Sequence, residues 1–152
     1  DKVNKLVLIA SVYKRSKTQI EIIKKRFKNA SKGKSITIDS INRWFSISYL
    51  KKNPNIFNFF FDLLEKKNNS DFLSAYKVFV ESDKSDIDFT KFNMPTLIMT
   101  GEKEIGSTPL MSRNLNKKIK NSFFYIIKDA KHGATIEKEK EVNSQLQKFL
   151  NK

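Results

Sequence analysis

The chain of 152 residues contains no cysteine, one histidine, three prolines and four glycines. The lack of cysteine excludes disulfides and thiolate metal sites, and a single histidine excludes a histidine-rich metal cluster within one chain. No stretch approaches the roughly 18 apolar residues of a membrane span, and residues 1–10 lack the plan of a signal peptide. We therefore expect a soluble protein with no metal, no cofactor and no membrane partner, and a cytoplasmic location as the default.

Acidic residues are also scarce, since 16 Asp and Glu stand against 30 Lys and Arg, and the net charge is +14. The excess is concentrated in residues 1–34, where Lys24, Lys25 and Arg26 form the densest run. Nearly all basic residues are lysines, and no zinc finger, arginine-rich reading helix or aromatic RNA-binding signature accompanies them. We interpret the charge as a solvated lysine surface and expect no nucleic-acid partner.

Short apolar runs predict β-strands at Val3–Ala10, Thr96–Thr100 and Phe123–Ile127. The first run is typical of a strand buried on both faces, as found inside a parallel sheet. Strands that alternate with helices predict a parallel sheet with right-handed crossovers. The expected fold class is therefore α/β, with parallel strands and flanking helices.

Apolar residues at spacings of three and four predict helices elsewhere in the chain. The longest are expected at Lys17–Lys32, Pro54–Lys67, Ser70–Ser82 and Ile136–Asn151. Asp39 can cap another helix, which runs on through Tyr49. A further helix has Pro109 in its first turn, with Ser107 or Thr108 as its cap.

The middle of the chain is purely helical and rich in phenylalanine. We divide the chain into a core strand and following helix at 1–34, a helical lid at 35–90, and a second part of the core at 91–152. Aromatic stripes on helices are usually core packing, but those of a lid can also wall an apolar ligand pocket. The candidates for such a wall are Trp44, Phe45, Phe60 and Phe61.

Glu104 and His132 each follow a predicted strand, and the two strands are successive in the chain. Functional residues of parallel sheets lie beyond the carboxyl ends of the strands, and successive strands are usually neighbours. A carboxylate that holds one imidazole nitrogen leaves the other free to take a proton from a nucleophile. The alternative interpretation is a surface glutamate and an ordinary loop histidine.

Several stretches resemble the last third of an α/β-hydrolase. They are Met94–Glu104 (MPTLIMTGEKE), Phe123–Glu137 (FFYIIKDAKHGATIE) and Val142–Leu150 (VNSQLQKFL). Upstream, Lys2–Ala10 resembles the strand that follows the nucleophile helix. The stretches Asn42–Phe45 (NRWF) and Phe72–Phe79 (FLSAYKVF) resemble the helical lid of the 3-oxoadipate enol-lactonase-like branch.

This resemblance implies that Glu104 is the acid of a catalytic triad and that His132 is the general base. The family more often has aspartate at the acid position, and the longer glutamate side chain leaves Glu102 as a weaker competitor. Asp129 is expected to order the loop, and Gly133 to supply a tight turn.

The nucleophile motif of the family, Gly-x-Ser-x-Gly, is not found, because no two of the four glycines bracket a serine at that spacing. Ser107 lies on the acid loop and has an ordinary role as a helix cap. We therefore expect the C-terminal portion of a longer hydrolase, inactive alone. A sheet edge left uncovered in such a portion predicts poor solubility, a homo-oligomer or pairing with another chain.

The leading hypothesis is a serine-type hydrolase that acts on a small-molecule carboxylic ester or lactone. The alternative is a non-catalytic basic module that binds an acidic partner or nucleic acid, and salt dependence of binding separates the two. A third hypothesis is a haloperoxidase-like or lyase-like protein with the same acid and base, since fold does not determine chemistry.

Overall fold

The computed structural model describes residues 2–84 and 86–151 and contains a parallel three-stranded sheet. Its strands are β1 (Leu6–Ile9), β2 (Thr96–Gly101) and β3 (Ser122–Ile127), in the spatial order β1-β2-β3. The predicted α/β class, with parallel strands and flanking helices, is confirmed.

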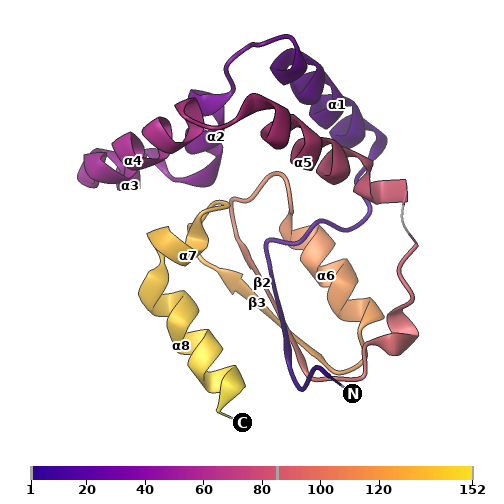
Figure 1. Ribbon diagram of the computed structural model, residues 1–152. Helices are drawn as coiled ribbons and strands as arrows, with labels where there is room; N and C mark the ends of the chain where they lie inside the picture. The colour runs from indigo at the N-terminus through magenta and orange to yellow at the C-terminus, as the bar shows by residue number, and fades with distance from the viewer. Residues whose placement is uncertain (1, 85, 152) are drawn as a thin grey trace.

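Helices make up most of the remaining chain (Figure 1). In chain order they are α1 (Lys17–Ser31), α2 (Thr37–Trp44), α3 (Ile47–Lys52), α4 (Pro54–Glu65), α5 (Asn69–Glu81), α6 (Pro109–Lys118), α7 (Ala134–Glu137) and α8 (Glu139–Leu150), with 3-10 turns at Ser82–Lys84 and Phe89–Lys91. Thr108 caps α6, since its side chain accepts a hydrogen bond from the backbone N–H of Met111. Within the described part of the chain, no helix is both long and apolar enough to cross a membrane.

β2 lies at the centre of the sheet and is buried along its whole length. Successive side chains of a strand point to opposite faces of the sheet, so β2 contributes to two apolar cores. Leu97 and Met99 pack in one cluster with Phe149 of α8. Ile98 packs in the other with Leu115 of α6. The sheet therefore lies between α8 and α6.

Helices α1 to α5 form a layer beside the carboxyl ends of the strands (Figure 1). α1 packs against α5, and α2 packs against α4. Phe27 of α1 meets Tyr76 of α5 edge to face, with ring centroids 5.6 Å apart. The sequence pattern groups residues 1–34 with the core, whereas the structure places α1 in the helical layer, because its apolar stripe meets α5.

The helix that the sequence predicts between Asp39 and Tyr49 is two helices in the structure. α2 ends at Trp44, and α3 begins after Ser46, whose side chain accepts a hydrogen bond from the N–H of Tyr49. Asp39 lies in the first turn of α2 and is not its cap. The serine cap competes with helix continuation because its hydroxyl satisfies a backbone donor at the new start.

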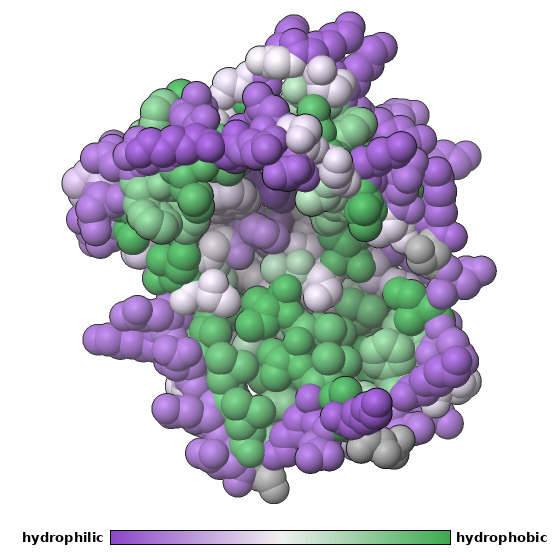
Figure 2. Space-filling model, viewed as in Figure 1, coloured by the Kyte–Doolittle hydropathy of each residue, from purple (hydrophilic) through white to green (hydrophobic). Residues whose placement is uncertain are grey.

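β1 is an edge strand and is only half-buried, although the sequence predicts a strand buried on both faces. Among the described residues it pairs with β2 alone. Leu6 and Ala10 direct their N–H groups to β2, so the N–H groups of Val7 and Ile9 face the open side. Apolar surface gathers over this half of the molecule (Figure 2). An open edge of this kind is a template for pairing with another strand.

We expect the isolated chain to self-associate through β1, and Val7→Pro to reduce the association. Proline removes an N–H that faces the open side and leaves the ladder to β2 intact. Light scattering coupled to size-exclusion chromatography measures the molecular mass of the parent chain and of Val7→Pro in solution. Leu8→Pro is the control, because it removes a donor from the β1–β2 ladder and lowers the free energy of unfolding instead. A monomeric parent chain would contradict the expectation.

Candidate active site

Gly101, the last residue of β2, brings two loops into contact. A Cβ at this position would lie 2.4 Å from the carbonyl oxygens of both Ala130 and Lys131. Two residues after Gly101, the backbone N–H of Lys103 donates a hydrogen bond of 2.8 Å to the carbonyl of Ala130. Glycine alone permits this approach. The loop after β2 and the loop after β3 therefore run side by side.

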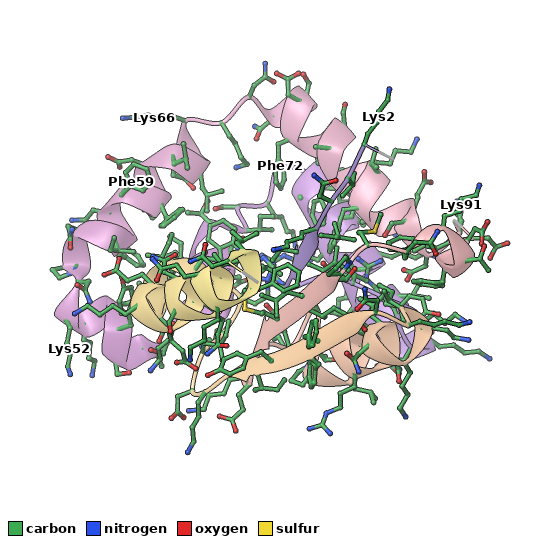
Figure 3. All side chains as sticks on the ribbon, turned by 90° about the horizontal axis from the view of Figure 1, so that it is seen from below. Lys2, Lys52, Phe59, Lys66, Phe72 and Lys91 are labelled. Carbon is green, nitrogen blue, oxygen red and sulfur yellow. The ribbon has the colours of Figure 1, made fainter. Side chains whose placement is uncertain are left out.

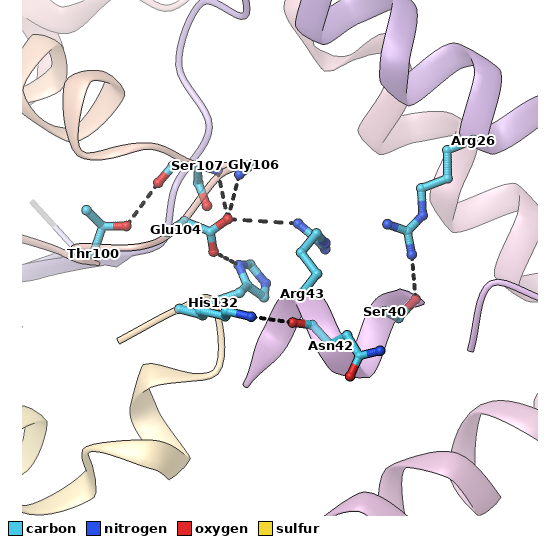
Figure 4. A network of polar contacts seen from close by, with 10 residues as sticks. Arg26, Ser40, Asn42, Arg43, Thr100, Glu104, Gly106, Ser107 and His132 are labelled. Carbon is cyan, nitrogen blue, oxygen red and sulfur yellow. Dashed lines mark hydrogen bonds and ion pairs between the residues drawn. The ribbon is translucent and has the colours of Figure 1, made fainter. Parts of the chain in front are cut away.

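The contact between these loops places Glu104 against His132 (Figure 4). The distance from Glu104 Oε2 to His132 Nδ1 is 2.5 Å. The carboxylate is fully buried, whereas 36% of the imidazole side chain is exposed. Glu104 Oε1 accepts hydrogen bonds from the N–H groups of Gly106 (2.6 Å) and Ser107 (3.3 Å). A carboxylate on Nδ1 fixes the tautomer and leaves Nε2 able to accept a proton.

Glu102, the competing acid, contacts a different part of the histidine loop. Its carboxylate accepts a hydrogen bond from the backbone N–H of Asp129 over 3.0 Å. Asp129 has a φ of 56° and forms an ion pair of 2.7 Å with Lys103, so it orders the turn after β3. The structure thus brings Glu104, and not Glu102, to His132.

The surroundings of Glu104 favour its ionised form. Burial raises the pKa of this carboxyl, but the hydrogen bond and charge of His132, the N–H of Gly106 and the charge of Arg43 outweigh it. The net pKa therefore lies below the ordinary value of 4.5. Arg43 Nη1 is 3.9 Å from Glu104 Oε1. A carboxylate held ionised in this way stabilises the imidazolium that forms when His132 takes a proton.

α2 and the residue after it hold the histidine loop from the side of the helical layer. The N–H of Gly133 donates to the carbonyl of Trp44 over 2.7 Å, and Lys131 Nζ donates to the carbonyl of Asn42 over 2.7 Å. A Cβ on Gly133 would lie 2.4 Å from the ring of Phe45. The helical layer is therefore attached directly to the loop that carries the histidine.

A cavity of about 310 Å³ lies between the helical layer and the loop after β2. Residues of α1, α2 and α5 line it, and Ile105 and Gly106 reach it from the acid loop. Arg43 also lines it, and this residue contacts Glu104 on its other side. The cavity therefore adjoins the Glu104–His132 pair, and Figure 2 shows a recess beneath the helical layer.

Of the four aromatic residues predicted for a pocket wall, Trp44 lines this cavity. Phe45 is only 1% exposed and lies against Gly133. Phe60 packs on Trp44 and Phe45, with ring centroids 5.6 and 5.3 Å apart, and Phe61 stacks on its own helix. Phe60 and Phe61 therefore pack within the helical layer, whereas Phe45 lies between this layer and the histidine loop.

The structure adds two residues to the site that the sequence reasoning missed, Arg43 and Gly106. Arg43 lies in the NRWF stretch between polar and aromatic residues, and its one signal in the sequence is that it is an arginine in a lysine-rich chain. Gly106 leaves room for it, since a Cβ there would lie 2.6 Å from Arg43 Nη1. Among the described residues, no group of three His, Asp or Glu is placed to hold a metal ion.

The parallel sheet between α6 and α8, with a helical layer beside its strand ends and an acid–histidine contact on successive loops, has the fold of the C-terminal part of an α/β-hydrolase. No family model matches the sequence. Solved structures of α/β-hydrolases confirm the fold that the sequence resemblance implies.

The chain is similar to several known proteins and spans a little more than half of the length of each. An enol-lactonase from Burkholderia xenovorans LB400 superposes with a TM-score of 0.84 at 18% identity, over 99% of this chain and 57% of that one. A thermophilic esterase from Thermogutta terrifontis gives 0.80 at 20% identity, with the same coverage of 99% and 57%. The (E)-2-((N-methylformamido)methylene)succinate hydrolase of Acinetobacter baylyi is 26% identical over 152 residues, 99% of this chain and 57% of the relative.

Stability should depend on pH through Glu104. Its folded-state pKa is lowered, so its stabilising contribution is present above the ordinary carboxyl pKa of 4.5 and is lost as the pH falls through the folded value. Urea titrations between pH 3 and 7 measure the free energy of unfolding. It should fall at low pH in the parent chain and fall less in Glu104→Gln. Glu102→Gln, outside the pair, serves as the control. Equal acid dependence in the parent and Glu104→Gln would contradict this assignment.

Proposed function

We propose that this chain supplies the acid, the general base and the lid of a serine-type hydrolase that acts on a carboxylic ester or lactone. The observation that carries the proposal is the contact of 2.5 Å between Glu104 and His132 Nδ1. The nucleophile belongs to a segment outside residues 1–152. The lengths of the relatives agree with this, since the chain spans 57% of each protein compared.

In this proposal His132 acts through Nε2. It takes the proton of a serine hydroxyl as that oxygen attacks the carbonyl carbon, and returns the proton to the leaving oxygen. In the second half of the reaction it activates water in the same way, which releases the acid and restores the serine. Glu104 orients the ring and stabilises the imidazolium without taking the proton itself.

The similar proteins are named for more than one chemistry. An enol-lactonase, an esterase and a hydrolase of a succinate derivative support hydrolysis, whereas bromoperoxidases are similar as well. Fold alone does not separate hydrolysis from a haloperoxidase-like or lyase-like reaction. The choice therefore depends on whether turnover of an ester requires His132.

We expect His132→Ala to lower kcat for p-nitrophenyl acetate by about 10²- to 10⁴-fold in the complete protein, because a general base contributes about that much. Glu104→Gln should also lower kcat strongly, since a neutral amide no longer fixes the tautomer of His132 or stabilises its imidazolium. Glu102→Gln is the matched control and should keep near-normal turnover, because Glu102 contacts Asp129 and not the histidine. Full activity in His132→Ala would refute the proposed function.

The isolated chain of 152 residues should show no His132-dependent turnover of the same ester. The measurement is initial-rate hydrolysis by the purified chain beside its His132→Ala variant. If the parent chain turns over ester and the variant does not, the nucleophile lies within residues 1–152.

A further inference from the structure

A carboxylate shortly after His132 reaches across to the helical layer and has no role in the acid–histidine pair. Glu137 is the last residue of α7. Its Oε2 accepts a hydrogen bond of 3.0 Å from the backbone N–H of Ser46, and its Oε1 accepts one from the hydroxyl of the same serine. The two residues are 91 positions apart in the sequence. The contact therefore joins α7 to the start of α3.

The start of α1 shows which donor such a carboxylate satisfies. The side chain of Ser16 accepts the N–H of Gln19 over 3.2 Å, and the side chain of Gln19 accepts the N–H of Ser16 over 2.9 Å. This exchange is a capping box, and it satisfies two backbone donors at the start of a helix. In α1 both halves of the box come from the first turn of the helix itself.

Helix α3 contains only one half of this arrangement. The hydroxyl of Ser46 accepts the N–H of Tyr49 over 3.2 Å, as in a capping box. Tyr49 occupies the position at which the box has its glutamate or glutamine, and its hydroxyl lies 3.5 Å from the carbonyl of Ile136. Glu137 supplies the second half of the box from α7. The cap of α3 is therefore complete only while α7 lies against it.

α3 has few other attachments of comparable strength. It is a helix of six residues, which is too short to be stable in isolation. It packs against α4, and Lys52 at its end lies with Phe59 of α4 at the outer edge of the molecule (Figure 3). Ile47, its first residue, is 64% exposed. Because little apolar surface is buried at its start, hydrogen bonds to a carboxylate are a large part of what holds α3 in place.

The segment after His132 touches the end of α2 as well. The N–H of Gly133 donates to the carbonyl of Trp44 over 2.7 Å, and the ring of Phe45 lies against Gly133. The N–H of Glu137 in turn donates to the carbonyl of Gly133 over 3.0 Å. The segment that directly follows the histidine is therefore joined both to the end of α2 and to the start of α3.

We propose that Glu137 is a positioning residue, whose carboxylate completes the cap of α3 and thereby fixes the helical layer to the loop that carries His132. Loss of the carboxylate removes the acceptor of the Ser46 N–H and loosens both sides of the contact together. This link between α3 and the histidine loop does not depend on the reaction, whereas its effect on turnover rests on the proposed function. Displacement of a catalytic group by about 1 Å costs about 10²-fold in rate, so a loosened loop should slow the reaction.

Hydrogen–deuterium exchange of the complete protein, measured by mass spectrometry without substrate, tests the link. In Glu137→Ala we expect exchange at least about tenfold faster both in α3 and in residues 131–137, because charged hydrogen bonds between them are lost. Glu141→Ala is the matched control, since this carboxylate accepts a hydrogen bond of 2.9 Å from the hydroxyl of Tyr125 in β3. The control should leave both segments unchanged. Faster exchange in only one of the two segments, or in neither, would overturn the link.

Glu137→Gln distinguishes a completed cap from a general loss of stability. A glutamine accepts the N–H of Ser46 and donates to its hydroxyl oxygen, much as Gln19 accepts the N–H of Ser16 in α1. We therefore expect exchange in Glu137→Gln to lie within about threefold of the parent. An impairment equal to that of Glu137→Ala would overturn the proposal, since the charge and not the cap would then be responsible.

Turnover of p-nitrophenyl acetate by the complete protein tests the effect on catalysis. We expect kcat to fall about ten- to 100-fold in Glu137→Ala, to recover largely in Glu137→Gln and to stay near the parent value in Glu141→Ala. Ser46→Ala should also lower kcat, and the double variant with Glu137→Ala should lose little more than Glu137→Ala alone, because both act through one contact. Additive losses would overturn the route through Ser46.

Circular dichroism shows whether each variant folds, and Ser46→Ala carries the exchange and kinetic tests if Glu137→Ala does not fold. The two readouts also separate this inference from the proposed function. Linked exchange in a parent protein that has no ester turnover would refute the hydrolase and keep the link. A normal kcat in Glu137→Ala despite faster exchange would refute the positioning role and keep the hydrolase.

Discussion

The backbone contact at Gly101 sets the separation of the two loops on which the site depends. A Cβ there would fall 2.4 Å from two carbonyl oxygens of the histidine loop, so any other residue would push the loops apart. The hydrogen bond between Glu104 and His132 spans that contact and tolerates little displacement. Burial of β2, which ends at Gly101, holds the acid loop in place through cores on both faces of the sheet.

The helical layer has two functions in this arrangement. Through the carbonyl of Trp44 and the ring of Phe45, which both contact Gly133, it supports the loop that carries His132. Through Arg26 and Arg43 it places positive charge in a cavity next to the acid loop. Since Trp44 both accepts the hydrogen bond of Gly133 and lines the cavity, a movement of α2 would alter the loop and the cavity together.

Much of the site follows from local pattern and chain order. The order strand, acid, helix, strand, histidine predicts that His132 meets a carboxylate from the loop after β2, because the carboxyl ends of successive parallel strands lie at the same edge of the sheet. Thr108 as a cap is one of two local alternatives, and the structure selects it. The half-buried state of β1 is less predictable, because it depends on a neighbouring strand far away in the sequence. The break at Ser46 has a local cap, but the carboxylate of the distant Glu137 also accepts hydrogen bonds from the backbone N–H and the hydroxyl of Ser46.

Composition and motif by themselves determined the α/β class, the acid–histidine pair and the absence of any cysteine chemistry. The choice between Glu104 and Glu102 was made by the tertiary structure, since both follow the same strand and only the path of the loop decides which carboxylate reaches the imidazole. The convergence of Arg15, Arg26 and Arg43 was likewise invisible in the sequence, where they are far apart. The packing of α1 against α5, with α2 lining the same cavity, brings these arginines together.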